Sequence, residues 1–177
     1  LQSLKMQDKI NQILSLFSAG EIESALDSVK ELIKDFPNEE ILFNISGACH
    51  AALGEFEEAI KKYKKSLTIN PNYAEAHNNL GATLQELGQL GKAANCYKKA
   101  IQIKSGYAEA HNNLGNTLKE LNQIDSAINS YKNAIEINPH YAEAHYALGV
   151  IFQDLNQLEE AVKSFEAVLL IKPELAE

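Results

Sequence analysis

The stretch YAEAHNNLG at residues 73–81 decides the fold, because it is repeated along the chain. The same nine letters return at 107–115, and a close copy, YAEAHYALG, stands at 141–149. Both returns come after 34 residues, and counting by this interval gives five frames, 6–39, 40–73, 74–107, 108–141 and 142–175. A period of this length is typical of a solenoid, in which each unit buries its apolar face against its neighbours.

Each frame is predicted to contain two helices. In the third frame, Leu80, Leu84 and Leu87 fall on one helical stripe, and Gly88 then interrupts the pattern. The segment KAANCYKKAIQI at 92–103 carries a second apolar stripe. The frames close at Pro37, Pro71, Ser105-Gly106, Pro139 and Pro173. Because the residue before proline is pushed out of helical geometry, these positions are expected to separate the helix pairs.

Small and large residues recur at fixed phases of the repeat. Glycine occupies one phase, at Gly47, Gly81, Gly115 and Gly149. Alanine occupies a second, at Ala25, Ala59, Ala93, Ala127 and Ala161. A large residue occupies a third, at Val29, Tyr63, Tyr97, Tyr131 and Phe165. A glycine inside a helix costs about 0.5–1 kcal/mol relative to alanine. Its recurrence therefore indicates a steric need, and we expect close helix crossing at these glycines.

Together these positions resemble the tetratricopeptide repeat (TPR) family over residues 6–175. The resemblance implies an all-α, right-handed solenoid of about five stacked antiparallel helix pairs. It divides the chain into a degenerate first repeat or amino-terminal cap (1–39), four repeats (40–73, 74–107, 108–141 and 142–175) and the start of a further, truncated unit (176–177). The first repeat departs from the pattern, since Gln12-Ile13 stands where the last three frames have Leu-Gly.

Composition and motifs argue against several classes of protein. The formal net charge is −8, which disfavours nucleic acid and anionic membranes as partners. No run of 18 apolar residues occurs, so no membrane-spanning helix is expected. The chain shows no nucleophile–base pair, phosphate loop or metal-ligand set, so we predict that it is not an enzyme and that it uses no cofactor or metal. A cytoplasmic location is expected.

Three histidines share one phase of the repeat, at His77, His111 and His145. They lie on the core-facing stripe of each first helix. Equivalent residues of stacked units should lie about 10 Å apart, whereas zinc holds its ligands at about 2 Å, so the three cannot share one ion. We therefore interpret them as structural residues.

Asparagine is unusually frequent in the first helices. Asparagine is a mediocre helix former, yet its amide can both donate and accept hydrogen bonds. In the TPR family the first helices line a concave groove that binds peptides, and an asparagine ladder resembles that of the TPR superhelix of O-linked N-acetylglucosamine transferase. The residues expected to bind peptide are Asn44, Glu75, Asn78, Asn79, Asn112, Asn113, Asn116, Lys119 and Tyr146. The alternative is that duplicated units simply inherited a solvated asparagine.

The resemblance implies a scaffold that binds a peptide or protein segment in its groove. Because the groove stripe carries Glu75, Glu109 and Glu143, we expect the bound segment to be neutral or basic rather than acidic. An alternative is the substrate-recruiting arm of a larger enzyme, such as a glycosyltransferase. The final apolar run also predicts self-association, because Val168, Leu169 and Ile171 would be partly exposed at an uncapped end.

Overall fold

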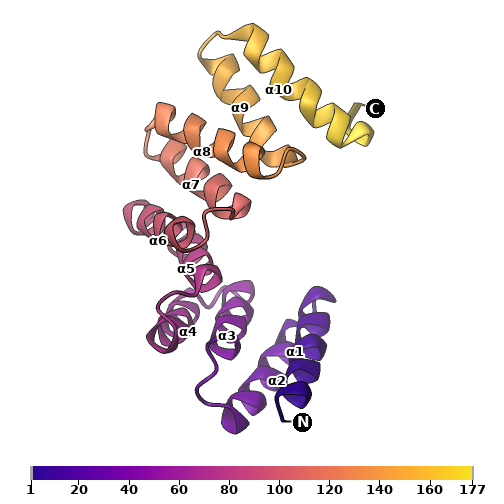
Figure 1. The fold of residues 1–177 in the computed structure, drawn as a ribbon, viewed down its shortest axis with the longest axis vertical. Helices are drawn as coiled ribbons and strands as arrows, with labels where there is room; N and C mark the ends of the chain where they lie inside the picture. Colours follow the sequence, from indigo (N-terminus) through magenta and orange to yellow (C-terminus); the bar gives the residue numbers. More distant parts are fainter. Residues whose placement is uncertain (1, 177) are drawn as a thin grey trace. The chain divides into compact units, whose positions relative to one another are not determined.

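The fold is an all-α helical-repeat solenoid (Figure 1). The computed structural model describes residues 2–176, with side chains for residues 5–174, so residue 177 of the predicted truncated unit lies outside the described residues. Its helices are α1 (Gln2–Ser18), α2 (Ile22–Asp35), α3 (Glu40–Ala52), α4 (Phe56–Ile69), α5 (Ala74–Glu86), α6 (Leu90–Ile103), α7 (Ala108–Glu120), α8 (Ile124–Ile137), α9 (Ala142–Asp154) and α10 (Leu158–Ile171), followed by the 3₁₀-helix η1 (Pro173–Ala176). No strand occurs within residues 2–176, and none of the helices described there is long and apolar enough to cross a membrane.

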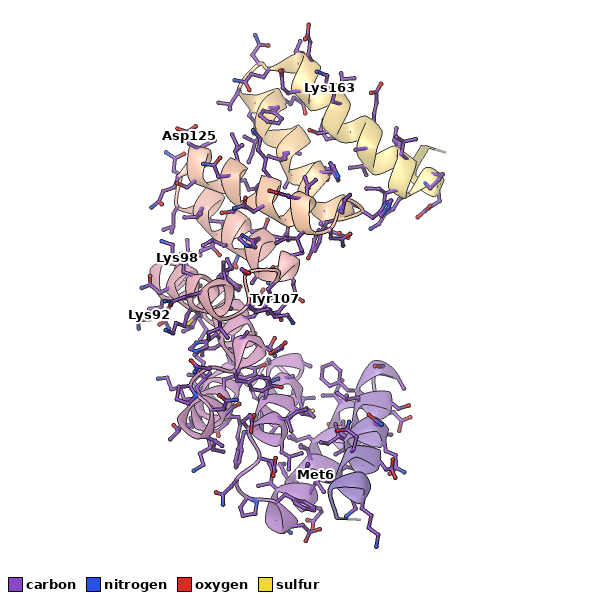
Figure 2. All side chains as sticks on the ribbon, viewed as in Figure 1. Met6, Lys92, Lys98, Tyr107, Asp125 and Lys163 are labelled. Carbon is purple, nitrogen blue, oxygen red and sulfur yellow. The ribbon has the colours of Figure 1, made fainter. Side chains whose placement is uncertain are left out.

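The helices form two compact units, Leu1–Gln89 and Leu90–Glu177, whose side chains are drawn in Figure 2. In the first unit each helix packs against the next one along the chain, from α1 to α5. The second unit repeats this arrangement from α6 to α10. Within each unit the core is therefore built between sequence neighbours, as expected of a repeat protein.

The helix boundaries follow the predicted breakpoints. Helices α2, α4, α8 and α10 each end two residues before a proline, and α6 ends two residues before Ser105. The turn after each first helix contains a residue with positive φ: Gly20 (81°), Gly54 (76°), Gly88 (70°), Asn122 (58°) and Asn156 (57°). Glycine and asparagine are the residues that adopt this left-handed conformation most readily, which explains their place in the repeat.

Asn122 has a φ of 58°, which strains any residue that has a Cβ atom, so glycine at this position should be neutral or stabilising. We expect Asn122→Gly to leave the free energy of unfolding unchanged or to raise it by up to about 1 kcal/mol, and Asn122→Val to lower it by about 1–2 kcal/mol. Chemical denaturation of both variants measures the difference. Equal stability of the valine variant and the wild type would contradict this explanation of the turn.

The recurring glycines make room for the recurring aromatic rings. A Cβ atom on Gly115 would lie 2.7 Å from Cε1 of Tyr131, and one on Gly149 would lie 2.6 Å from Cε1 of Phe165. Gly47 and Tyr63 show the same relation, with 2.6 Å between the added Cβ and Cε1 of the ring. A steric need is therefore present at these three glycines, but the group that approaches is the aromatic ring of the second helix and not a second backbone, as close helix crossing would require.

The first repeat fills the space between its two helices with different residues. Its large-residue phase holds the smaller Val29, and Ile13 takes the place of the glycine. Both side chains are buried in one core cluster with Leu26 and Leu42. A larger residue on the first helix therefore accompanies a smaller one on the second, which keeps the interior filled.

The three repeated histidines join the starts of α5, α7 and α9 to the preceding turns. Nε2 of His77, His111 and His145 lies 2.9, 3.2 and 3.0 Å from the carbonyl oxygens of Pro71, Ser105 and Pro139, respectively. His111 is buried, and the other two are half-buried. These hydrogen bonds support the structural role inferred from the sequence.

Candidate functional site

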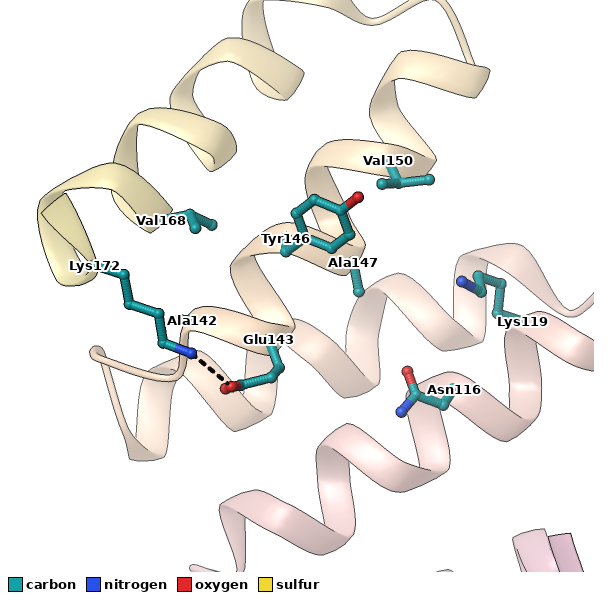
Figure 3. A pocket seen from close by; sticks show the side chains of 9 residues that line it. All are labelled: Asn116, Lys119, Ala142, Glu143, Tyr146, Ala147, Val150, Val168 and Lys172. Carbon is teal, nitrogen blue, oxygen red and sulfur yellow. Dashed lines mark hydrogen bonds and ion pairs between the residues drawn. The ribbon is translucent and has the colours of Figure 1, made fainter. Parts of the chain in front are cut away.

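A hollow of about 450 Å³ opens on the second unit, between helices α7, α9 and α10 (Figure 3). It is lined by Asn116, Lys119, Ala142, Glu143, Tyr146, Ala147, Val150, Val168 and Lys172. Three residues predicted from the sequence to bind peptide, Asn116, Lys119 and Tyr146, come together here. We call this feature the α9 hollow.

Apolar side chains dominate the centre of the α9 hollow. Ala147 and Val168 are each 7% exposed, and Val150 is half-buried. Tyr146 is 57% exposed, and its ring lies 5.8 Å from that of Phe165, measured between centroids, at an interplanar angle of 59°. This tilted ring contact favours one orientation of the Tyr146 side chain, which presents an exposed aromatic surface to the hollow.

The amide of Asn116 is held by a buried tyrosine. The hydroxyl of Tyr131 donates a hydrogen bond to Oδ1 of Asn116 at 2.7 Å. Among the described residues none accepts a hydrogen bond from Nδ2 of Asn116, so its donor capacity is left for a ligand. The equivalent positions hold Ala48, Ala82 and Val150, so this pairing is specific to the fourth repeat.

Burial raises the pKa of Tyr131 to about 12, and the negative charge of Glu120 adds to the rise. An unfolded tyrosine titrates near pH 10, so the contribution of this group to stability is full below pH 10 and is lost as the pH rises through about 12. We expect wild-type stability to fall more steeply above pH 10 than that of Tyr131→Phe, which has no hydroxyl to ionise. Denaturation midpoints between pH 8 and pH 11 measure the two slopes, and parallel curves would contradict the assignment.

The charged groups at the rim of the α9 hollow are unequally paired. Nζ of Lys172 lies 3.0 Å from Oε1 of Glu143, and the pair is drawn as a dashed line in Figure 3. Hydrogen bonds from the backbone N–H of Glu143 and from Lys172 lower the pKa of the Glu143 carboxyl. Within the described part of the chain Lys119 makes no ion pair, so its ammonium group is available to a ligand.

The first unit contains a smaller hollow, of about 320 Å³. It is lined by Ala51, Phe56, Tyr63, Asn79, Ala82, Thr83 and Glu86. Nδ2 of Asn79 donates a hydrogen bond to Oδ1 of Asn44 at 3.1 Å, and Asn44 is only 8% exposed. This amide pair joins α3 to α5, and Asn79 also lines the hollow.

The remaining predicted residues are divided between interior and surface. Asn78 and Asn112 are buried, at 1% and 7% exposure, so their amides face the interior and they do not line the α9 hollow. Oδ1 of Asn112 has no hydrogen-bond partner within residues 5–174. Glu75 and Asn113 are half-buried on the same stripe as Asn79 and Asn116.

Sequence reasoning missed the contribution of α10. It placed the groove on first helices alone, whereas Val168 and Lys172 line the α9 hollow from the second helix of the last repeat. Their phase carries Ser66 and Asn70 in the second repeat and Ala134 and Asn138 in the fourth. The third repeat has Ala100 and Lys104 at these two positions, so the lysine is shared and only the larger aliphatic residue, Val168, sets the last repeat apart from it.

Models of known families match most of the chain. A model described as TPR repeat matches residues 50–88, 84–122 and 115–156, and one described as tetratricopeptide repeat matches 142–175. No curated protein matches the chain.

Solved structures share the fold over nearly the whole chain. MamA is 25% identical, with 92% of this chain and 95% of that chain covered and a TM-score of 0.79. YrrB, described as a TPR protein with an unusual peptide-binding site, is 22% identical over 93% of this chain and 85% of that chain, with a TM-score of 0.70. TTC0263, a thermophilic TPR protein in Thermus thermophilus, is 21% identical over 95% and 92%, with a TM-score of 0.79.

Proposed function

Because the chain belongs to the tetratricopeptide repeat family, whose members are generally non-enzymatic scaffolds for protein interaction, we propose that it binds an extended peptide segment at the α9 hollow. The observation that carries this proposal is the convergence of Asn116, Lys119 and Tyr146 on one apolar depression. A concave, largely apolar site with a few placed polar groups is the usual form of a ligand site.

Each part of the hollow suits a different part of a peptide. Ala147, Val150 and Val168 offer an apolar floor for one side chain of the ligand. Nδ2 of Asn116 is placed to donate to a backbone carbonyl oxygen, which every peptide carries whatever its sequence. The ring of Tyr146 adds a rigid, half-apolar contact surface of the kind that dominates binding energy at many interfaces.

The charge of the surrounding stripe favours a neutral or basic segment. Glu109, Glu120 and Asp154 are exposed on α7 and α9, and the Glu143 carboxylate is already paired with Lys172. An acidic ligand would be repelled by these carboxylates along most of its length. Lys119 is the exception, and it suits a single acceptor group at one end of the bound segment.

The fold itself accommodates such a site. YrrB, which shares this fold, is described as a TPR protein with an unusual peptide-binding site. We propose the same class of ligand here on the strength of the α9 hollow, and the identity of the segment is left to experiment.

A peptide-library selection tests the proposal. Peptides selected against the wild-type chain should bind Asn116→Ala about threefold to tenfold more weakly, because one hydrogen bond to the ligand is lost. Asn133→Ala is the matched control, since Asn133 is exposed on α8 outside the hollow. Equal affinity of wild type and Asn116→Ala for every selected peptide would show that Asn116 does not contact the ligand. A library that yields no specific binder would contradict the proposed function.

A further inference from the structure

One buried amide of the second unit lacks a hydrogen-bond donor. Asn112 of α7 is 7% exposed, and no described residue donates a hydrogen bond to its Oδ1. A buried oxygen without a donor lowers stability, because it has given up its hydrogen bonds to water and gained none within the protein. Oδ1 of Asn112 is therefore a candidate acceptor for a group that does not belong to this chain.

The first unit shows which donor an amide at this phase of the repeat binds. Asn44 holds the equivalent position in α3 and is similarly buried, at 8% exposure. Its Oδ1 accepts a hydrogen bond at 3.1 Å from Nδ2 of Asn79 in α5. Asn79 also lines the smaller hollow of that unit. A donor that lies at a hollow can therefore reach an amide that is more than nine-tenths buried.

The second unit lacks the equivalent donor. Helices α7 and α9 pack against each other as α3 and α5 do, but the residue equivalent to Asn79 is Ala147. Its methyl group cannot donate a hydrogen bond, and it lines the α9 hollow (Figure 3). A ligand amide that lies over Ala147 can therefore take the place that the amide of Asn79 has in the first unit.

A second unpaired group lies one helical turn further along α7. Nδ2 of Asn116 donates to no acceptor within the described residues, and Asn116 lines the α9 hollow. Residues four apart on a helix share one face, with Cβ atoms about 5–6 Å apart. Helix α7 thus presents an acceptor and a donor within reach of a single ligand group. The other repeats cannot do so, because the equivalents of Asn116 are Leu14, Ala48, Ala82 and Val150.

This pair of groups selects a side-chain amide. Lysine and arginine side chains have no acceptor for Asn116, and an ionised carboxylate has no donor for Asn112. A primary amide has both, about 2.3 Å apart, at the end of one or two methylene groups. That length allows it to reach past Ala147, whereas a serine or threonine hydroxyl ends one bond beyond Cβ. A backbone N–H is held further out by the Cα atoms on either side of it.

We propose that the segment bound at the α9 hollow carries a glutamine or asparagine whose side-chain amide bridges Asn112 and Asn116. The amide N–H donates to Oδ1 of Asn112, and the amide oxygen accepts from Nδ2 of Asn116. The second N–H of Nδ2 stays available for a backbone carbonyl oxygen of the ligand. This inference rests on the proposed peptide binding, and it adds Asn112 to the site as a residue that determines specificity.

Matched peptides test the ligand side of the bridge. The probe is a fluorescently labelled peptide selected from a random library against the wild-type chain. We expect the selected sequences to share a glutamine or asparagine at a fixed distance from an apolar residue. Replacing that residue by an apolar residue of the same length, or by the corresponding acid, should weaken binding about tenfold or more. Fluorescence anisotropy measures this loss, which arises because buried partners on the protein are left unpaired.

Asn112→Leu tests the protein side. It should weaken the selected peptide about tenfold or more and should bind the amide peptide and its apolar version equally well. Its urea midpoint should not fall below that of the wild type, because the variant removes an oxygen that has no donor. Asn44→Leu removes an amide that is paired, so it should lower the midpoint. Asn133→Leu, on the exposed side of α8, is the control for binding.

Ala147→Asn supplies the donor from within the chain. It should raise the urea midpoint by pairing with Asn112, and it should weaken the selected peptide about tenfold or more by filling the α9 hollow. This variant decides the matter even if Asn112→Leu does not fold. A lower midpoint, or unchanged affinity for the peptide, would overturn the inference.

The same experiments separate this inference from the proposed function. Selected peptides that lose affinity for Asn116→Ala, but keep it for Asn112→Leu and without their own amide, would overturn the bridge and leave peptide binding at the hollow intact. Peptides that lose affinity for Asn112→Leu yet carry no common glutamine or asparagine would assign the donor to the ligand backbone and overturn the side-chain amide. A library without any binder would overturn both proposals.

Discussion

Gly115→Ala should lower the free energy of unfolding by about 1–3 kcal/mol, although alanine is the better helix former. The added Cβ would lie 2.7 Å from Cε1 of Tyr131 and 2.8 Å from its Cδ1. The ring has little freedom to move away, because Tyr131 is completely buried and its hydroxyl is bonded to Asn116. Gly91→Ala is the matched control, since a Cβ atom there meets nothing within 4 Å. It should leave stability unchanged or raise it by up to about 1 kcal/mol.

A double-mutant cycle shows whether the ring is the cause. In a Tyr131→Val background the space opposite residue 115 opens, as it does opposite Val29 in the first repeat, where Ile13 fills it. In the Tyr131→Val background Gly115→Ala should be neutral or stabilising. The coupling energy between positions 115 and 131 should therefore be about 1–3 kcal/mol. Chemical denaturation of the four proteins measures it. Additive effects would mean that the glycine phase is set by something other than the ring.

Tyr146→Ala should weaken binding of library-selected peptides about tenfold or more, the size of effect usual for an aromatic residue at the centre of an interface. Tyr146 presents the largest exposed apolar surface in the α9 hollow, and its contact with Phe165 keeps the ring ordered. Isothermal titration calorimetry with one selected peptide gives the affinities. A change in affinity below about twofold would show that the ring lies outside the bound segment.

Two further variants make this result specific. Tyr146→Phe keeps the ring and removes the hydroxyl, so it should retain most of the affinity if the ring surface carries the contact. Ile137→Ala removes another exposed apolar side chain, 38% exposed on α8 and outside the hollow, and should bind as the wild type does. Loss of binding in all three variants would point to a general effect on the fold.

The sequence predicted the fold because the repeat copies both the helices and their interruptions. The 34-residue period and the closing prolines placed the helix boundaries within a residue or two of those observed. The glycine phase indicated a steric need, but the expected reason was close helix crossing, whereas the structure places an aromatic ring of the second helix against the glycine. The handedness of the whole array stays a prediction.

The candidate site was harder to predict from the sequence than the fold, because equivalent residues of different repeats can have different surroundings. Asn112 and Tyr146 share a phase, yet the first is 7% exposed and the second 57%. A period fixes which residues are equivalent, but burial depends on the side chains of the neighbouring helices, which differ between repeats. For the same reason the pairing of Asn79 with Asn44, and that of Asn116 with Tyr131, could not be read from the repeated letters.

Methyl NMR of the protein with a selected peptide tests the central proposal, peptide binding at the α9 hollow, most directly. Saturating peptide should shift the methyl signals of Ala147, Val150 and Val168, which line the hollow, and leave those of Leu158 and Val162 unchanged. Signals of Ala147, Val150 and Val168 that do not move at saturation, while signals elsewhere in the chain do, would contradict it.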